Sequence, residues 1–85
     1  MNIKIKKNDF DFLIKNLKKL KPHLIPTLNN SDINNGNVTL KLDDEISNEI
    51  NDWAQEEIQK SGYDENYDLN NLGKILQNIS DCFSQ

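Results

Sequence analysis

The chain has 85 residues, of which 35% are apolar, so it can form one small domain and is too short for two. One Cys, one His and three Gly exclude disulfide scaffolds, zinc sites with four ligands and glycine-rich phosphate loops. No apolar run matches a secretory signal or a membrane span, and we therefore expect a cytoplasmic protein with no membrane partner.

The net charge of −4 conceals an uneven distribution along the chain. Residues 1–41 carry eight lysines against three acids, a charge of +5, whereas residues 42–85 carry two lysines against eleven acids, a charge of −9. An acidic half repels nucleic acid and attracts basic proteins at a rate that depends on salt. The alternative is that the acids only keep a small domain soluble.

The amino-terminal half predicts one strand and one helix. Ile3 and Ile5 alternate with lysines, which indicates a short strand over residues 3–6. Helical spacing then predicts a helix over residues 10–20, with Asn8 or Asp9 as its N-cap and Pro22 beyond its end. The helix would bury Phe10, Leu13, Ile14, Leu17 and Leu20. Phe12 points away from this stripe, so it is either exposed, which we favour, or in contact with another surface.

Residues 21–37 are interpreted as a connection that ends in a turn at Asn34-Asn35-Gly36-Asn37. Four apolar side chains would anchor this connection to the core: Leu24, Ile25, Leu28 and Ile33. Alternation at Val38, Leu40 and Leu42 predicts a second strand, which could pair with residues 3–6.

Two helices are expected in the acidic half. The first, over residues 44–61, has Asp43 or Asp44 as a cap and stops at Gly62. The second covers residues 70–83, and Gly73 in its first turn indicates either close packing or nothing. The predicted fold is a mostly helical α+β domain over residues 1–85, with three principal helices and one or two short strands.

Four acids of the first of these helices fall on one face and define what we call the acid ridge: Glu45, Glu49, Asp52 and Glu56. Glu57 instead falls among Ile46, Ile50 and Trp53, where a carboxylate must be paired, extend to solvent or lie at an edge. We favour a structural partner, such as a lysine or a backbone amide, and the alternative is a functional acid.

Few residues support chemistry. Asp64, Asn66 and Asp68 have calcium-loop spacing, but Leu69 and Ile75 occupy the positions that need Gly and Glu, so no metal is expected. His23 has no second histidine and should be a surface residue, and Cys82 should be a buried structural thiol. No catalytic residue or cofactor is predicted.

The length and charge favour a protein-binding role. A chain of 85 residues can hardly enclose the deep cleft that two catalytic carboxylates need, so we do not expect an enzyme. Its lysines, without arginine, offer no bidentate reading of bases, so nucleic acid is not an expected partner.

The acidic half also carries a local resemblance. It is carried by Leu42-Asp43-Asp44-Glu45-Ile46, Trp53 with Glu56-Glu57-Ile58-Gln59, Gly62-Tyr63-Asp64-Glu65-Asn66-Tyr67, and Gly73-Lys74-Ile75-Leu76 through Ile79 and Asp81 to Phe83. Over residues 42–83 the chain resembles small bacterial immunity proteins of polymorphic-toxin and contact-dependent growth inhibition systems. The Gly62 to Tyr67 turn, at its fixed distance from Gly73, is the most specific part.

The resemblance implies an immunity protein that binds a cognate toxin domain, such as a nuclease with a basic cleft, and covers its active site. The residues expected to bind the toxin are the acid ridge, then Tyr63, Asp64, Glu65 and Tyr67, because exposed aromatics beside acids make good anchors. For the two tyrosines the alternative is that they clamp the turn onto the core, and for Tyr63 we favour that role.

Two other functions remain open. One is a small acidic adaptor, or a phage-type inhibitor that mimics nucleic acid toward a host protein, and the other is the small subunit of an enzyme. The sequence leaves the oligomeric state open.

Overall fold

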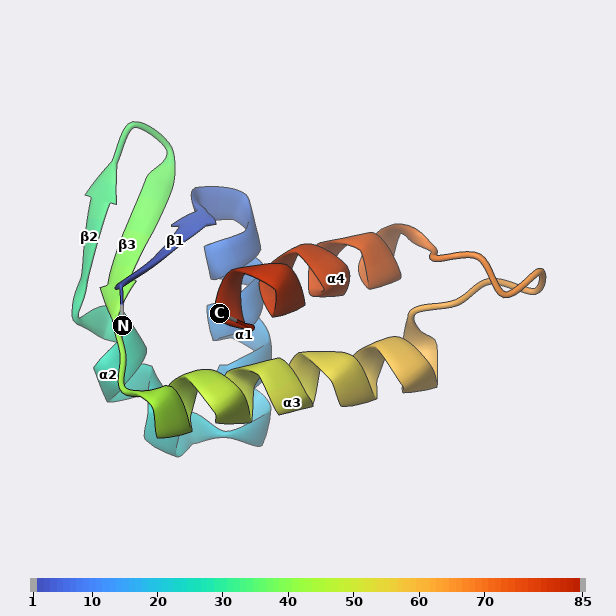
Figure 1. The fold of residues 1–85 in the computed structure, drawn as a ribbon, viewed down its shortest axis with the longest axis horizontal. Helices are drawn as coiled ribbons and strands as arrows, with labels where there is room; N and C mark the ends of the chain where they lie inside the picture. The colour runs from blue at the N-terminus through green and yellow to red at the C-terminus, as the bar shows by residue number, and fades with distance from the viewer. Residues whose placement is uncertain (1, 85) are drawn as a thin grey trace. The chain divides into compact units, whose positions relative to one another are not determined.

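The computed structural model describes residues 2–84, and they form a mostly helical α+β fold with a small antiparallel sheet (Figure 1). The chain divides into two compact units, the first reaching to Ile46 and the second beginning at Ser47. The elements follow in the order β1 (Asn2–Lys6), α1 (Lys7–Leu20), η1 (Pro22–Leu24), α2 (Ile25–Asn29), β2 (Ser31–Asn34), β3 (Asn37–Lys41), α3 (Asp44–Ser61) and α4 (Asn71–Phe83).

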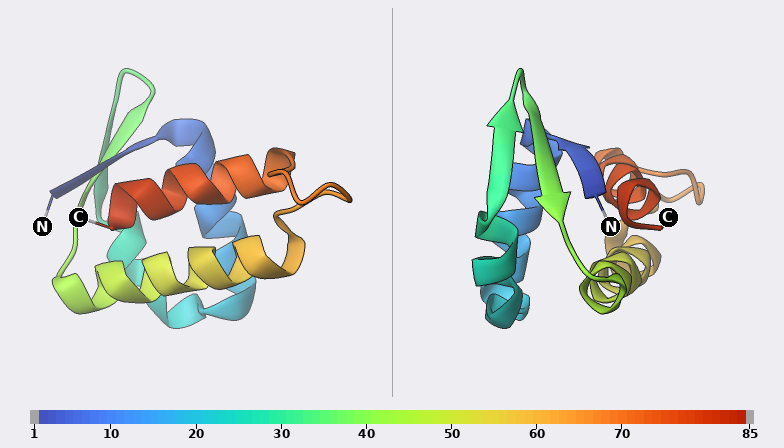
Figure 2. Two further views of the ribbon diagram at one scale, coloured as in Figure 1. Left: turned by 45° about the vertical axis from the view of Figure 1, so that its right-hand side comes forward. Right: turned by 60° about the vertical axis from the view of Figure 1, so that its left-hand side comes forward.

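The sheet of the first unit has β3 in the middle, paired antiparallel with β1 and with β2 (Figure 2). The predicted pairing of residues 3–6 with the second strand is confirmed, with Ile3 opposite Leu40 and Ile5 opposite Val38. These four side chains share one face of the sheet and are buried, so they form the core of the first unit with the apolar side chains of α1.

The hairpin turn between β2 and β3 is the one expected from the sequence. Asn35 and Gly36 both have positive φ, at 52° and 80°, as a two-residue type I′ turn requires. The Gly36 carbonyl accepts a hydrogen bond from the Lys7 N–H at 2.9 Å, so the turn also supports the first residue of α1.

That hydrogen bond explains why α1 begins earlier than predicted. The expected caps, Asn8 and Asp9, lie inside the helix, and the N-cap is Lys6, whose side chain makes no cap bond. The chain passes from β1 into α1 with no loop, and a main-chain carbonyl about thirty residues away satisfies one of the free amides of the first turn. The helix ends at Leu20, which is exposed rather than part of the core, and Phe12 is half-buried rather than exposed.

Residues 21–37 are more structured than predicted. Pro22 and Pro26 each stand near the start of a helix, where proline costs no hydrogen bond, so they initiate η1 and α2 instead of interrupting the chain. Leu24 and Leu28 are buried as expected and Ile25 is half-buried, but Ile33 is 60% exposed. Ile33 belongs to β2, a strand with no buried residue. The sheet has three strands, so the expected number of one or two strands was too low.

The two helices of the acidic half lie where the sequence predicts them. The Asp43 carboxylate accepts a hydrogen bond from the Ile46 N–H at 2.9 Å at the start of α3, which confirms one of the two cap candidates. The Asn70 side-chain oxygen accepts a bond from the Gly73 N–H at 2.7 Å and caps α4. Among residues 2–84, the helices are all too short or too polar to cross a bilayer.

In the second unit, α3 and α4 run antiparallel, side by side, as a helical hairpin (Figures 1 and 2). At one end the Ser47 hydroxyl donates to the Phe83 carbonyl at 3.0 Å, and near the middle Ser80 bonds the side chains of Asn51 and Gln55. At the other end, a Cβ placed on Gly73 would lie 2.1 Å from the Gly62 carbonyl oxygen. The close-packing interpretation of Gly73 is therefore confirmed: no side chain fits between the two backbones.

Candidate functional site

The loop that joins α3 to α4 is a small, hydrogen-bonded hairpin that extends past the ends of both helices (Figure 1). Tyr63 and Leu69 pair in an isolated antiparallel bridge, and the Asp64 N–H donates to the Asp68 carbonyl at 2.8 Å. The base of the loop is closed by Asn70, whose N–H donates to the Gly62 carbonyl and whose side-chain amide donates to the Ser61 carbonyl, both at 2.9 Å. Main-chain hydrogen bonds and the Asn70 side chain therefore fix the loop at its base and along its sides.

Asp64 organises the tip of this loop. One oxygen of its carboxylate accepts hydrogen bonds from the Asn66 N–H at 2.8 Å and the Asp68 N–H at 3.1 Å, and its carbonyl accepts from the Tyr67 N–H at 3.0 Å. The calcium-loop spacing noted in the sequence thus belongs to an Asx turn, in which the carboxylate of Asp64 bonds the backbone of its own loop. Asp64 has a structural task in addition to any contact with a partner.

Tyr67 occupies the left-handed position of the loop, with φ of 62°. A type I turn followed by one left-handed residue is a common short hairpin connection, and glycine usually fills that last position. Here the position is filled by tyrosine, and its side chain is 86% exposed, whereas that of Tyr63 is 46% exposed. The clamp interpretation does not hold for Tyr67, because a ring so exposed contributes little to the core of the chain.

The acid ridge lies along one face of α3. Glu45, Asp52 and Glu56 are exposed and Glu49 is half-buried. The side chains that bond α4 come from Ser47, Asn51 and Gln55, and at 100° per residue the ridge lies about a third of a turn round the helix from them. The ridge is therefore on the side of α3 that does not pack on α4.

The predicted contact residues form two groups. The first is the acid ridge, and the second is what we call the acidic loop, the segment Tyr63–Asp68 with its three carboxylates and two tyrosines. Asp68 also belongs to this loop, but it was not among the contact residues predicted from the sequence, although its charge and its place beside Tyr67 could have suggested it. The joint role of Gly62, Asn70 and Gly73 at the base of the loop was not predicted either.

Glu57 lies, as predicted, on the buried side of α3, and its side chain is half-buried. The structural partner expected for it is not found: within residues 2–84 its carboxylate has no hydrogen bond or ion pair. The Trp53 indole N–H, one helical turn away and buried, likewise has no acceptor among these residues. The Trp53 indole N–H and the Glu57 carboxylate are thus a hydrogen-bond donor and an acceptor on the same side of α3, and neither is satisfied within residues 2–84.

The other residues considered for metal binding or catalysis do not form a site. His23 is exposed, as expected, and Cys82 is half-buried rather than fully buried. Across the described residues, no three His, Cys, Asp or Glu side chains are grouped so that they could hold a metal ion.

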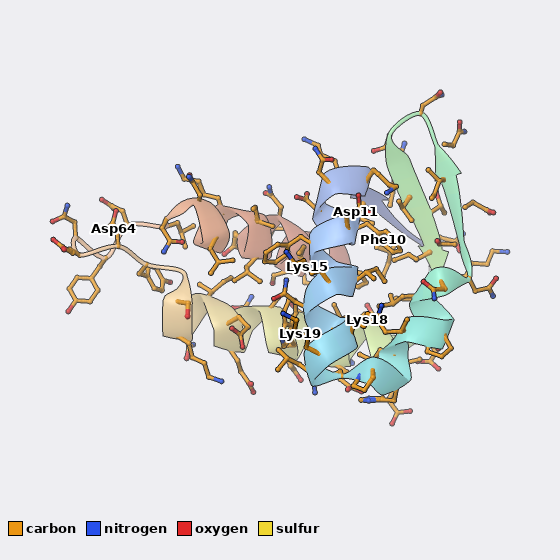
Figure 3. All side chains as sticks on the ribbon, turned by 180° about the vertical axis from the view of Figure 1, so that it is seen from behind. Phe10, Asp11, Lys15, Lys18, Lys19 and Asp64 are labelled. Atoms are coloured by element: carbon orange, nitrogen blue, oxygen red, sulfur yellow. The ribbon has the colours of Figure 1, made fainter. Side chains whose placement is uncertain are left out.

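The first unit carries most of the positive charge. Figure 3 shows Lys15, Lys18 and Lys19 along α1, and Lys7 forms an ion pair with Asp11 at 2.6 Å on the same helix. Counted by unit, the chain up to Ile46 has eight lysines and six acids, a charge of +2, and the chain from Ser47 has two lysines and eight acids, a charge of −6. The acidic loop, marked by Asp64 in Figure 3, therefore belongs to a unit of strongly negative charge.

No protein-family model, curated protein or solved structure matches this chain.

Proposed function

We propose that this chain is a binding protein that neutralises a cognate bacterial toxin domain, as an immunity protein does, and that it performs no chemistry itself. The acidic loop and the acid ridge would cover a basic surface of the toxin, such as the substrate cleft of a nuclease. The observation that carries the proposal is Tyr67: a bulky, 86% exposed side chain at a position where glycine would fit without strain.

The conformation of Tyr67 costs free energy that the fold itself does not recover. A left-handed conformation costs an L-residue about 1–2 kcal/mol, and an exposed ring regains little of this by burial. Tyrosine is among the residues that contribute most to binding energy at protein interfaces, because its ring is large and its hydroxyl can hydrogen-bond. A tyrosine kept in a strained, exposed position is thus better explained by contact with a partner than by stability.

The charges around Tyr67 indicate the chemistry of that partner. Glu65 stands two residues before Tyr67 and Asp68 directly after it, and the whole second unit has a charge of −6. A lysine or arginine of the partner could stack on the Tyr67 ring and pair with these carboxylates. The field of the unit would also speed the encounter with a basic surface, and salt would slow it. We therefore expect a basic, cytoplasmic protein as the partner.

The test begins with the full chain, tagged and used to capture proteins from the lysate of its own organism. We expect one protein domain in stoichiometric amount, whose expression alone arrests growth and whose co-expression with the chain does not. Recovery of a host polymerase or another protein that is harmless and keeps its activity would contradict the immunity role and favour the adaptor. A catalytic chain that needs this protein for activity would favour an enzyme subunit.

Matched variants then locate the surface. Asp52→Lys and Asp32→Lys make the same change in charge at exposed positions, but only Asp52 belongs to the acid ridge. We expect Asp52→Lys to slow association and weaken its dependence on salt, and Asp32→Lys to change neither. Equal effects of the two variants would show that the net charge of the chain, rather than the ridge, governs binding.

A further inference from the structure

The turn between β2 and β3 contains an exposed asparagine that is followed by glycine, a pair that the proposed binding role does not explain. The chain contains fourteen asparagines, and Asn35 is the one that is followed by glycine. Both residues of this Asn35-Gly36 pair are exposed. The other asparagines precede residues with a side chain, so they provide internal controls for the chemistry of this pair.

The surroundings of Gly36 leave its main-chain nitrogen accessible. A Cβ built on Gly36 would meet nothing within 4 Å, so the space around the residue is open. Within residues 2–84 the Gly36 N–H donates no hydrogen bond, although its carbonyl accepts one from Lys7. The nitrogen can therefore lose its proton to base without breaking a bond of the fold.

We propose that Asn35 is a site of spontaneous deamidation in the folded protein. The deprotonated Gly36 nitrogen attacks Cγ of Asn35, a C–N bond forms, and the side-chain nitrogen leaves as ammonia, which gives a five-membered succinimide. Water then opens the ring at one of its two carbonyls, yielding either aspartate or isoaspartate. No oxidant or reductant takes part: one water enters, one ammonia leaves, and the formal net charge goes from −4 to −5.

The reaction depends on local opening of the turn, because Asn35 must rotate to bring its Cγ to the Gly36 nitrogen. The turn is suited to such opening: β2 has no buried residue, so it is held to β3 without help from the core. Exposed hairpin ends open at a low free-energy cost compared with global unfolding. The lack of a Cβ at residue 36 removes the main obstacle to ring closure, and this obstacle persists at every other asparagine.

Isoaspartate would alter more than the turn. It adds a methylene to the main chain between residues 35 and 36, which displaces the Gly36 carbonyl from the Lys7 N–H. That bond is 2.9 Å long and supports the first residue of α1, which has no side-chain cap. The modification therefore weakens the start of α1, whereas ordinary aspartate, which tolerates a left-handed conformation, leaves the bond in place.

The experiment uses the full chain, incubated in mildly alkaline buffer made with ¹⁸O-water. Digestion at lysine and fragmentation that distinguishes isoaspartate from aspartate then locate the label. We expect Asn35 to gain ¹⁸O before any other asparagine, with isoaspartate as the larger product. Asn30, which precedes the small residue Ser31, is the internal control. Conversion of Asn35 no faster than that of Asn30, or conversion only in denaturant, would overturn the proposal.

A second measurement tests the consequence for α1. Amide exchange at Lys7 should be faster in the isoaspartate-containing protein than in fresh protein. Freshly purified Asn35→Asp is the control, because it carries the new charge without the extra methylene, and its Lys7 exchange should match the wild type. Unchanged exchange in the isoaspartate form would refute the link between the turn and the helix.

Discussion

Replacing Tyr67 with glycine should make the protein more stable. The left-handed conformation costs an L-residue about 1–2 kcal/mol, which glycine avoids. Against this, the greater freedom of glycine in the unfolded chain costs about 0.5–1 kcal/mol. The Tyr67 side chain is 86% exposed, so its removal forfeits little burial. The midpoints of these two ranges differ by about 0.75 kcal/mol in favour of glycine. Since about 1 kcal/mol shifts Tm by about 4–8 °C in a chain of this size, Tm should rise by about 3–6 °C.

Urea denaturation and thermal unfolding of Tyr67→Gly beside the wild type measure this difference. Tyr63→Gly is the matched control, since Tyr63 lacks the left-handed conformation and pairs with Leu69 in a bridge. It should lose stability, because glycine adds backbone freedom with no strain to relieve. If Tyr67→Gly loses about 1 kcal/mol or more, the ring supports the fold, and the argument for Tyr67 as a binding residue fails. Under the proposed function, the stabilised variant should bind the captured partner more weakly.

Three further outcomes follow from the packing. Gly73→Ala should lose about 3 kcal/mol in urea denaturation, because its Cβ would meet the Gly62 carbonyl, and a loss below about 1 kcal/mol would show that the helices can separate there. Leu13→Ala should lose about 2–5 kcal/mol by the same measurement, whereas Leu20→Ala, at a position 58% exposed, should stay near the wild-type value; equal losses would contradict the burial assignment. Asn70→Ala should lose about 1–2 kcal/mol and speed amide exchange at the start of α4, and unchanged exchange would mean that this cap is dispensable.

Elements whose start and end signals lie within their own sequence were predicted well. The bounds of α3 were correct, because Asp43 supplies the cap and Gly62 follows the last turn. The turn at residues 34–37 was predicted, although not as part of a hairpin, because asparagine and glycine tolerate the positive φ that it needs. The pairing of β1 with β3 was predicted because both strands alternate buried and exposed residues.

Elements that depend on distant partners were missed. β2 shows no alternation of buried and exposed residues, and it exists because β3 offers it a ladder of hydrogen bonds. The sequence around Ile33 therefore did not indicate that this side chain is exposed. An apolar residue at the end of a helix, such as Leu20, can keep the helical spacing of the buried residues although no core lies beside it, and Leu20 is exposed.

The sequence predicted most residues of the candidate site, but it did not predict the conformation of the loop that carries them. The acids and tyrosines of residues 63–68 stand out in the sequence, and the spacing of Asp64, Asn66 and Asp68 was noted there. The hydrogen bonds of the Asp64 carboxylate and the positive φ of Tyr67 depend on how the loop closes on Asn70, which no pattern within the loop reveals. Tyr67 therefore became a leading candidate only once its backbone conformation was known.

The bond between Lys7 and Gly36 also constrains the order of folding. A helix usually nucleates from local contacts within microseconds, and α1 is the helix with the clearest apolar stripe in the amino-terminal half. Its first turn nevertheless obtains a partner only when the chain has closed a loop of about thirty residues and formed the β2–β3 turn. The middle of α1 can thus form early, while its first turn becomes stable only together with the hairpin, which couples a local event to a slower, non-local one.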